Sequence, residues 1–186
     1  MNPDIAVILF AVDVVILGLL LVGAVASAVW PERRIWPPPQ PRSWQYRLIW
    51  MGFYAAFGIG AALLFFDWNS WVFRSPLRFV AGIPLTLLGG LLAAWAVATA
   101  GWTNTSGVRG RFVSSGPYRF TRNPQYLGDI VFFVGVGFMA NSLFVWITHL
   151  FLAFIFREAP LAEEPWLEEQ YGAEYREYLR KIPRFP

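Results

Sequence analysis

The sequence predicts an all-α integral membrane protein with five transmembrane helices, the last two forming a short hairpin, followed by a cytoplasmic helical tail. Composition is the first observation behind this prediction. Hydrophobic residues make up 56% of the chain and charged residues 15%, against about 45–50% and about 25% in soluble domains. The second observation is that the apolar residues form long blocks, and the third is that most basic residues lie between those blocks.

The 186 residues are enough for one domain. We expect a three-span scaffold over residues 1–100, and a second half over residues 101–186 that carries a polar loop, the hairpin and the tail. The absence of cysteine excludes disulfides, thiolate nucleophiles and cysteine-ligated metals. The single histidine, His149, argues against a histidine metal site. No metal and no nucleic-acid partner is expected.

Residues 5–29 form the first apolar block, interrupted only by Asp13. Because about 20 apolar residues span a bilayer, a transmembrane helix is expected. A cleaved signal peptide is the alternative, since Ala24-Val-Ala and Ala26-Ser-Ala resemble processing sites. The length of the block and the lack of a positively charged N-terminal region argue against it. We interpret Asp13 as a packing group, with contact to a substrate as the alternative.

Residues 30–47 are expected to form a linker, because five prolines oppose a regular helix. The tryptophans in and beside it are typical of the membrane interface. Residues 48–66 and 77–100 are the second and third predicted spans. Pro84 is expected to kink the third span, and the glycines of that span allow another helix to approach closely.

The last apolar block, residues 127–156, would be about 45 Å long as one helix, which exceeds a bilayer core of about 30 Å. Asn141-Ser142 near its middle could form the turn of a hairpin. With a hairpin, the linker, the loop of residues 101–125 and the tail share one side and hold 13 of the 15 basic residues. Without it, the split is eight to seven. The positive-inside rule therefore favours the hairpin and places the loop and the tail in the cytoplasm.

The tail, residues 157–186, mixes glutamates with basic residues. Gly172 is expected to divide it into two short helices, and Pro183 to end the second. An aromatic and aliphatic stripe recurs at steps of three and four residues, as on one face of a helix, and we interpret it as packing. The stripe consists of Leu167, Tyr171, Tyr175, Tyr178 and Ile182.

Two polar blocks carry the candidate chemistry. Residues 116–128 read Gly-Pro-Tyr-Arg-Phe-Thr-Arg-Asn-Pro-Gln-Tyr-Leu-Gly, and residues 163–184 read Glu-Glu-Pro-Trp-Leu-Glu-Glu-Gln-Tyr-Gly-Ala-Glu-Tyr-Arg-Glu-Tyr-Leu-Arg-Lys-Ile-Pro-Arg. They contain no Ser-His-Asp set and no phosphate-binding P-loop. Their carboxylates, tyrosines, arginines and backbone N–H groups suit a cationic, hydroxyl-rich cofactor.

These blocks resemble the GxYxxxRHPxYxG and EExxLxxxFGxxYxxYxxxxPR signatures of the isoprenylcysteine carboxyl methyltransferase family and its relatives, which include phospholipid methyltransferases. The resemblance covers residues 103–186. It implies a membrane-embedded enzyme that transfers a methyl group from S-adenosylmethionine, leaving S-adenosylhomocysteine. The acceptor would be an S, O or N atom of an apolar or membrane-associated molecule, such as a prenylcysteine, a lipid or a small thiol. The compact length favours a prokaryotic plasma membrane.

The resemblance also implies roles for individual residues. Arg122 and Glu164 are the candidate catalytic residues, and Arg122 is expected to orient a carboxylate of the cofactor or the acceptor. Glu163 and Glu164 are expected to hold polar groups of the cofactor, and Tyr126 to line its pocket. The candidate cofactor-binding residues are Tyr118, Asn123, Pro124, Tyr126, Leu127, Glu163 and Glu164.

One position departs from the family pattern, because Asn123 stands where the family has histidine. Asparagine cannot act as a base near neutral pH. Two alternatives therefore stay open. One is a lipid-modifying, reductase-like enzyme on the same scaffold, which would bind a nicotinamide cofactor. The other is a non-catalytic membrane protein that retains the pocket. Asp129, close behind Tyr126, faces either the site or a neighbouring helix.

Overall fold

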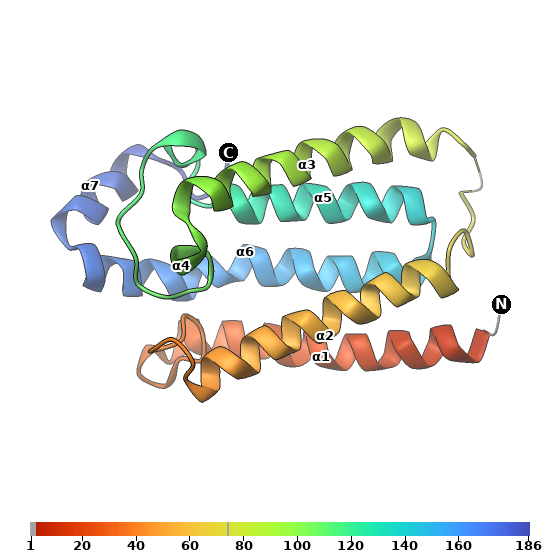
Figure 1. The fold of residues 1–186 in the computed structure, drawn as a ribbon, viewed down its shortest axis with the longest axis horizontal. Coiled ribbons are helices and arrows are strands. Elements are labelled where there is room, and N and C mark those ends of the chain that lie inside the picture. Colours follow the sequence, from red (N-terminus) through yellow and green to blue (C-terminus); the bar gives the residue numbers. More distant parts are fainter. Residues whose placement is uncertain (1–2, 74) are drawn as a thin grey trace.

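The computed structural model describes residues 3–73 and 75–186, and these residues form helices and connecting loops without a β-strand (Figure 1). Two of the short elements, η1 and η2, are 3₁₀ helices. The elements in chain order are α1 (Pro3–Val29), η1 (Pro31–Arg33), α2 (Trp44–Phe66), α3 (Arg78–Ala100), α4 (Trp102–Thr105), η2 (Gly116–Arg119), α5 (Pro124–Ala140), α6 (Leu143–Tyr171) and α7 (Ala173–Lys181).

Four of the described helices, α1, α2, α3 and α6, are long and apolar enough to cross a membrane. This supports the prediction of an integral membrane protein. The remaining predicted span, the fourth in chain order, corresponds to α5, which is apolar but has only 17 residues. The expected division between the last span and the tail at Arg157 is absent, because α6 continues without a break to Tyr171. Its glutamates and leucines are good helix formers, so a change in polarity does not end the helix.

The turn between α5 and α6 lies at Asn141 and Ser142, where the sequence suggested it. Asn141 has a left-handed backbone, with φ of 47°, a conformation that asparagine tolerates better than most residues. Its side-chain amide donates to Asn69 Oδ1 at 2.8 Å, and the Ser142 hydroxyl accepts from the N–H of Val145 at 3.1 Å. The turn is therefore fixed by hydrogen bonds to the α2–α3 connection and by an N-cap.

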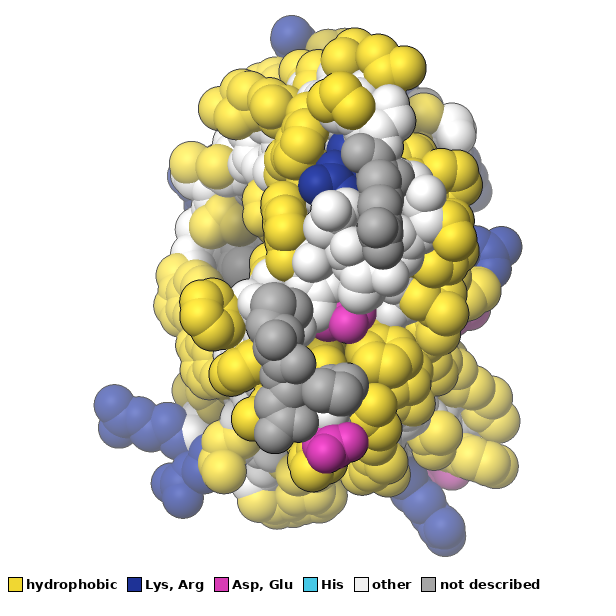
Figure 2. Space-filling model, turned by 90° about the vertical axis from the view of Figure 1, so that its right-hand side faces the viewer, with side chains coloured by type: hydrophobic (Ala, Val, Ile, Leu, Met, Phe, Trp, Pro, Cys, Tyr) yellow, Lys and Arg dark blue, Asp and Glu magenta, His cyan; other side chains and the backbone are white. Residues whose placement is uncertain are grey.

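The polar connections gather at one end of the helices. Figure 1 shows the α1–α2 linker, the α3–α5 loop and α7 together at the left, and the N-terminus, the α2–α3 connection and the α5–α6 turn at the right. Figure 2 looks onto the right-hand end, where hydrophobic side chains make up most of the visible surface. The segments that carry 13 of the 15 basic residues thus share one end, as the charge pattern predicted.

Helices α3 and α5 approach each other through glycines. A Cβ atom added at Gly89 would lie 2.3 Å from the backbone nitrogen of Phe132 and 2.6 Å from the carbonyl oxygen of Gly128. Gly128 meets the backbone of Ala93 in the same way, at 2.5 Å. These contacts are backbone to backbone, so no side chain can rotate to make room. The close approach matters for the site because α5 begins within the polar loop.

We expect Gly89→Ala to destabilise the protein by about 1–3 kcal/mol, because overpacking forces the two helices apart. Unfolding in mixed detergent micelles, monitored by circular dichroism, measures this loss of stability. Gly58→Ala on α2 is the matched control, since a Cβ atom there meets nothing within 4 Å and alanine favours helix more than glycine does. Equal stability of the two variants would contradict the α3–α5 packing.

Candidate functional site

Helix α7 and the end of α6 pack against the α3–α5 loop through aromatic side chains. The ring of Phe112 in the loop lies 5.4 Å from that of Tyr171, 6.2 Å from that of Tyr175 and 5.5 Å from that of Tyr178. The last two contacts are edge-to-face, a favourable arrangement for aromatic pairs. The tyrosine stripe is therefore a packing surface, as expected from its spacing, and its partner is the loop.

Hydroxyl groups of the stripe stabilise the same contact through hydrogen bonds. Tyr178 donates to the carbonyl of Tyr118 at 2.6 Å, and Tyr171 donates to the carbonyl of Gly110 at 3.1 Å. Burial raises the pKa of Tyr178 to about 12. Burial is also the main cause that raises the pKa of Tyr118 and of Tyr175. Each hydroxyl therefore stays protonated, and Tyr178 remains a donor.

This arrangement predicts that the contact between the tail and the loop becomes less stable at alkaline pH. The pKa of Tyr178 is raised on folding from about 10, so its contribution to stability is complete below pH 10 and is lost as pH rises through about 12. Tyr178→Phe is expected to cost about 1 kcal/mol at neutral pH and to reduce the loss between pH 10 and 12. Hydrogen exchange of α7 measures both effects. If the variant lost as much stability as the wild type between pH 10 and 12, the prediction would be contradicted.

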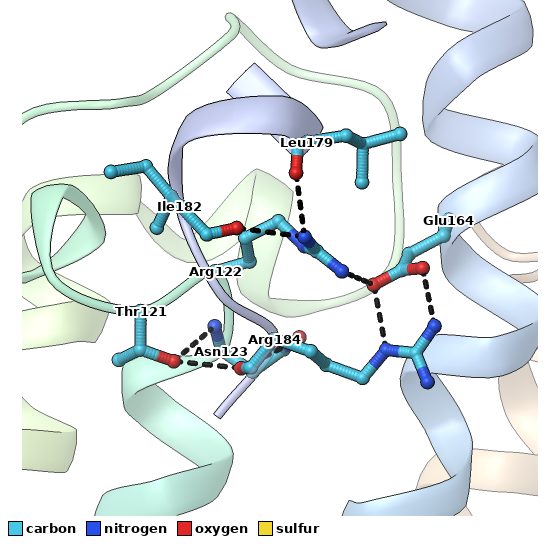
Figure 3. Close-up of polar contacts among 7 residues, drawn as sticks. All are labelled: Thr121, Arg122, Asn123, Glu164, Leu179, Ile182 and Arg184. Atoms are coloured by element: carbon cyan, nitrogen blue, oxygen red, sulfur yellow. Dashed lines mark hydrogen bonds and ion pairs between the residues drawn. The ribbon is translucent and has the colours of Figure 1, made fainter. Parts of the chain in front are cut away.

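Arg122, Glu164 and Arg184 form a network that connects the segment just before α5, the last third of α6 and the C-terminal segment (Figure 3). Glu164 Oε1 accepts from Arg122 Nη2 at 2.7 Å and from Arg184 Nε at 2.8 Å, and its Oε2 accepts from Arg184 Nη2 at 2.6 Å. Hydrogen bonding to this carboxylate is the main cause that raises the pKa of Arg184. Glu164 is thus paired with two arginines inside the protein.

The same end of the loop also binds backbone groups of the C-terminal segment. Arg122 Nη1 donates to the carbonyls of Ile182 at 2.7 Å and Leu179 at 3.2 Å. The Asn123 side-chain amide donates to the carbonyl of Arg184 at 3.2 Å (Figure 3). Asn123 therefore acts in this structure as a hydrogen-bond donor to the chain. This contact requires no proton transfer.

Glu163 differs from Glu164 in having only neutral partners. It accepts a hydrogen bond from the indole of Trp36 at 2.6 Å and another from the hydroxyl of Tyr126. Among the described residues no ion pair to Glu163 is formed. Ser27 holds Trp36 in place by accepting its backbone N–H at 3.1 Å. An ionised Glu163 is therefore a negative charge without a cationic partner, next to two aromatic rings.

A cavity of about 130 Å³ lies between the loop and the tail, and we call it the polar cavity because charged and hydroxyl-bearing side chains are among its walls. Six of the residues suggested by the sequence face it: Tyr118, Arg122, Asn123, Tyr126, Glu163 and Glu164. Pro124 and Leu127, also suggested, are not among the lining residues. Trp36 and Thr105 line the cavity but were missed. Local spacing gave no signal for either, because both lie outside the two polar blocks.

A second, apolar cavity of about 650 Å³ lies among the helices. Its walls come from α1, α2, α3, α5 and α6, and they are mostly aliphatic and aromatic, with Asp13, Asp129 and His149 among the few polar groups. Asp129 therefore faces this cavity, and its carboxyl is hydrogen-bonded by Gln125. Four residues line both cavities: Trp36, Thr105, Gln125 and Tyr126. The polar and the apolar cavity thus share a wall.

Comparison with known proteins shows the family of this chain. The sequence pattern of the family described as phospholipid methyltransferase matches residues 77–174, slightly more than half of the chain. The chain belongs to this family. The matched segment contains the loop, the start of α5 and both glutamates, but not α1, α2 or Trp36. The first 76 residues of this family member therefore contribute walls to both cavities from outside the matched segment.

Curated relatives include a probable protein-S-isoprenylcysteine O-methyltransferase from Oryza sativa subsp. indica, 31% identical over 128 residues, which are 65% of this chain and 65% of the rice protein. Protein-S-isoprenylcysteine O-methyltransferase B from Arabidopsis thaliana is 28% identical over 109 residues, 55% of each chain. The chain thus matches less than two thirds of the length of these relatives. No solved structure matches it.

Proposed function

We propose that this protein transfers a methyl group from S-adenosylmethionine to an S, O or N atom of an apolar, membrane-associated acceptor. The observation that carries the proposal is the shared wall between the polar and the apolar cavity. A methyltransferase that uses a water-soluble donor and a lipid-like acceptor needs two sites of opposite polarity that meet at the reacting atoms. Family membership and the names of the relatives support the same reaction class.

The residues of the polar cavity fit this cofactor in their chemistry. A carboxylate and aromatic rings attract a sulfonium and an ammonium, and Tyr118, Tyr126 and Glu163 supply these groups. The volume of about 130 Å³ is below the range of about 300–1,000 Å³ that is usual for ligand pockets. Binding therefore requires the α3–α5 loop to move away from the tail. Gly107 and Gly110 allow that segment to change its backbone conformation.

When bound, S-adenosylmethionine supplies an electrophilic methyl group. Glu163 lines the polar cavity beside the shared wall, where its charge holds a cation in place, while Trp36 and Tyr126 of that wall fix its carboxylate. Arg122 and Glu164 act as positioning residues, since their contacts hold the tail against the loop. Orientation of two reactants can supply about 7–11 kcal/mol of a barrier. A methyl transfer can therefore proceed with Asn123 at the position of the family's histidine.

The acceptor lies in the apolar cavity. The relatives in rice and Arabidopsis are named for isoprenylcysteine, a thioether that carries a long apolar chain. A cavity of about 650 Å³ lined by Phe53, Phe57, Phe133 and Phe156 offers a matching apolar surface. Helices α2 and α3 both contribute to its walls, so a lipid-like molecule could enter between them from the bilayer.

In this proposal α5 is a short fifth crossing that forms a hairpin with the first half of α6. The end that carries the linker, the loop and α7 then lies in the cytoplasm of a prokaryotic plasma membrane, by the positive-inside rule. This places the polar cavity where S-adenosylmethionine is available. Labelling of single cysteines introduced into this cysteine-free chain, at Glu174 and at Ser75, tests the orientation with a membrane-impermeant reagent.

Calorimetric titration of the detergent-purified protein with S-adenosylhomocysteine tests the proposal. Saturable binding is expected, and methyl transfer from labelled S-adenosylmethionine to added membrane lipids or thiols should follow. Binding of a nicotinamide cofactor instead would favour a reductase-like enzyme. No binding of either would favour a non-catalytic membrane protein. Both of these results would contradict the proposed reaction.

A further inference from the structure

We propose that the inner end of the apolar cavity is a binding site for a hydroxyl group carried on the apolar chain of the acceptor. The identity of the ligand as an acceptor rests on the proposed function. The site itself rests on three polar residues that line the apolar cavity, Asp13, Thr148 and His149. Along α6, His149 lies 14 residues before Glu163 of the polar cavity, which is about 21 Å of helix. Asp13 lies outside the segment that matches the family.

Asp13 is the principal observation. It lies near the middle of α1, its side chain is only 2% exposed, and it lines the cavity. Its Oδ1 atom has no hydrogen-bond partner among the described residues. A buried polar atom without a partner is unfavourable in apolar surroundings, and ionisable groups inside a membrane usually mark a functional contact. A ligand group in the cavity would complete the hydrogen bonding of Asp13.

His149 indicates that the ligand group is a hydrogen-bond donor. Its Nδ1 atom lies 2.9 Å from the carbonyl oxygen of Phe133, and a carbonyl can only accept, so Nδ1 carries the proton. The Nε2 atom of the neutral ring then has a free lone pair and is an acceptor. The hydroxyl of Thr148 already donates to the carbonyl of Val145 at 3.1 Å. The inner end therefore offers acceptors, which a ligand hydroxyl complements as a donor.

The position of the site along α6 sets the distance between this hydroxyl and the methylated atom. Ala159 and His149 both line the cavity, and Ala159 lies nearer to Glu163 along α6. Ten residues of helix separate them, which is about 15 Å. An extended chain advances about 1.2 Å per bond, so about 12 carbon atoms cover this distance. The ligand class is thus a medium-length chain with a reactive atom at one end and a hydroxyl at the other.

The experiment compares two probes, a linear thiol of about 12 carbon atoms and its ω-hydroxy analogue. Each is titrated into the protein in lipid nanodiscs, and calorimetry measures the two affinities. The ω-hydroxy thiol is expected to bind about tenfold more tightly, as one additional hydrogen bond allows. Equal affinities would overturn the proposal and are the result expected if an ordered water molecule alone satisfies Asp13.

Variants test whether Asp13 causes the preference for the ω-hydroxy thiol. Asp13→Leu should bind both thiols equally, whereas Asp13→Asn keeps a carbonyl acceptor and should keep the preference. Thr86→Val is the control, because the Thr86 hydroxyl bonds to the Gly82 carbonyl at 2.8 Å, outside the cavity. Persistence of the preference in Asp13→Leu would overturn the assignment. Titration with S-adenosylhomocysteine is a separate readout, so a failure of the proposed function is distinguishable from a failure of this site.

Discussion

Replacing Glu163 by glutamine is expected to weaken the binding of S-adenosylmethionine by about 100-fold, which corresponds to about 3 kcal/mol. The substitution keeps the size of the side chain and an oxygen that can accept from Trp36 and Tyr126. It removes the one carboxylate charge of the polar cavity that no arginine pairs with. The loss should be smaller for S-adenosylhomocysteine, because that molecule lacks the sulfonium charge.

Calorimetry with both ligands measures this difference. Glu174→Gln is the matched control, because Glu174 is exposed on α7 and does not line the cavity. Its affinities should equal those of the wild type. If Glu163→Gln and Glu174→Gln bind S-adenosylmethionine equally well, the assignment of Glu163 to the cofactor is wrong.

Replacing Arg122 by methionine should destabilise the docked tail by about 2 kcal/mol, because the variant loses the charged hydrogen bond to Glu164, which keeps only Arg184 as its partner. The side chains of Arg122 and Glu164 are only 12% and 15% exposed. The variant also leaves the carbonyls of Leu179 and Ile182 without their donor. Cofactor binding should weaken as a consequence, since α7 forms one wall of the polar cavity.

Limited proteolysis near Gly172 and hydrogen exchange of α7 measure this effect. Arg176→Gln is the control, since the ion pair of Arg176 with Glu168 joins side chains that are 54% and 42% exposed. Exposed pairs contribute about 0–1 kcal/mol, so that variant should keep its tail protected. A tail equally protected in Arg122→Met and Arg176→Gln would show that the network does not hold the loop and the tail together.

The membrane character and the approximate bounds of α1, α2 and α3 could be predicted from the sequence, because apolar blocks of sufficient length leave few alternatives. The turn at Asn141-Ser142 could also be predicted, since a length limit and the charge distribution both required it. The extent of α6 could not. Hydropathy changes at Arg157, but helix formation depends on the backbone, and the helix continues to Tyr171.

The hydrogen-bond partners of the site residues were harder to predict, because they come from distant parts of the sequence that meet only in the folded protein. Glu163 and Glu164 are neighbours in sequence and equivalent by pattern, yet Glu164 meets two arginines while Glu163 meets an indole and a phenol. Trp36 lies 127 positions before Glu163, and its sequence context gave no indication of that contact. No local spacing encodes such contacts, so a three-dimensional structure was needed to distinguish the two carboxylates.

A structure of the complex with S-adenosylhomocysteine is the measurement that tests the central claim most directly. The ligand is expected between the α3–α5 loop and α7, with its sulfur close to Glu163 and beside Gln125 and Tyr126, facing the apolar cavity. A ligand bound elsewhere would contradict the proposed site. A ligand in the polar cavity whose sulfur is separated from the apolar cavity by closed side chains would contradict the proposed transfer between the two.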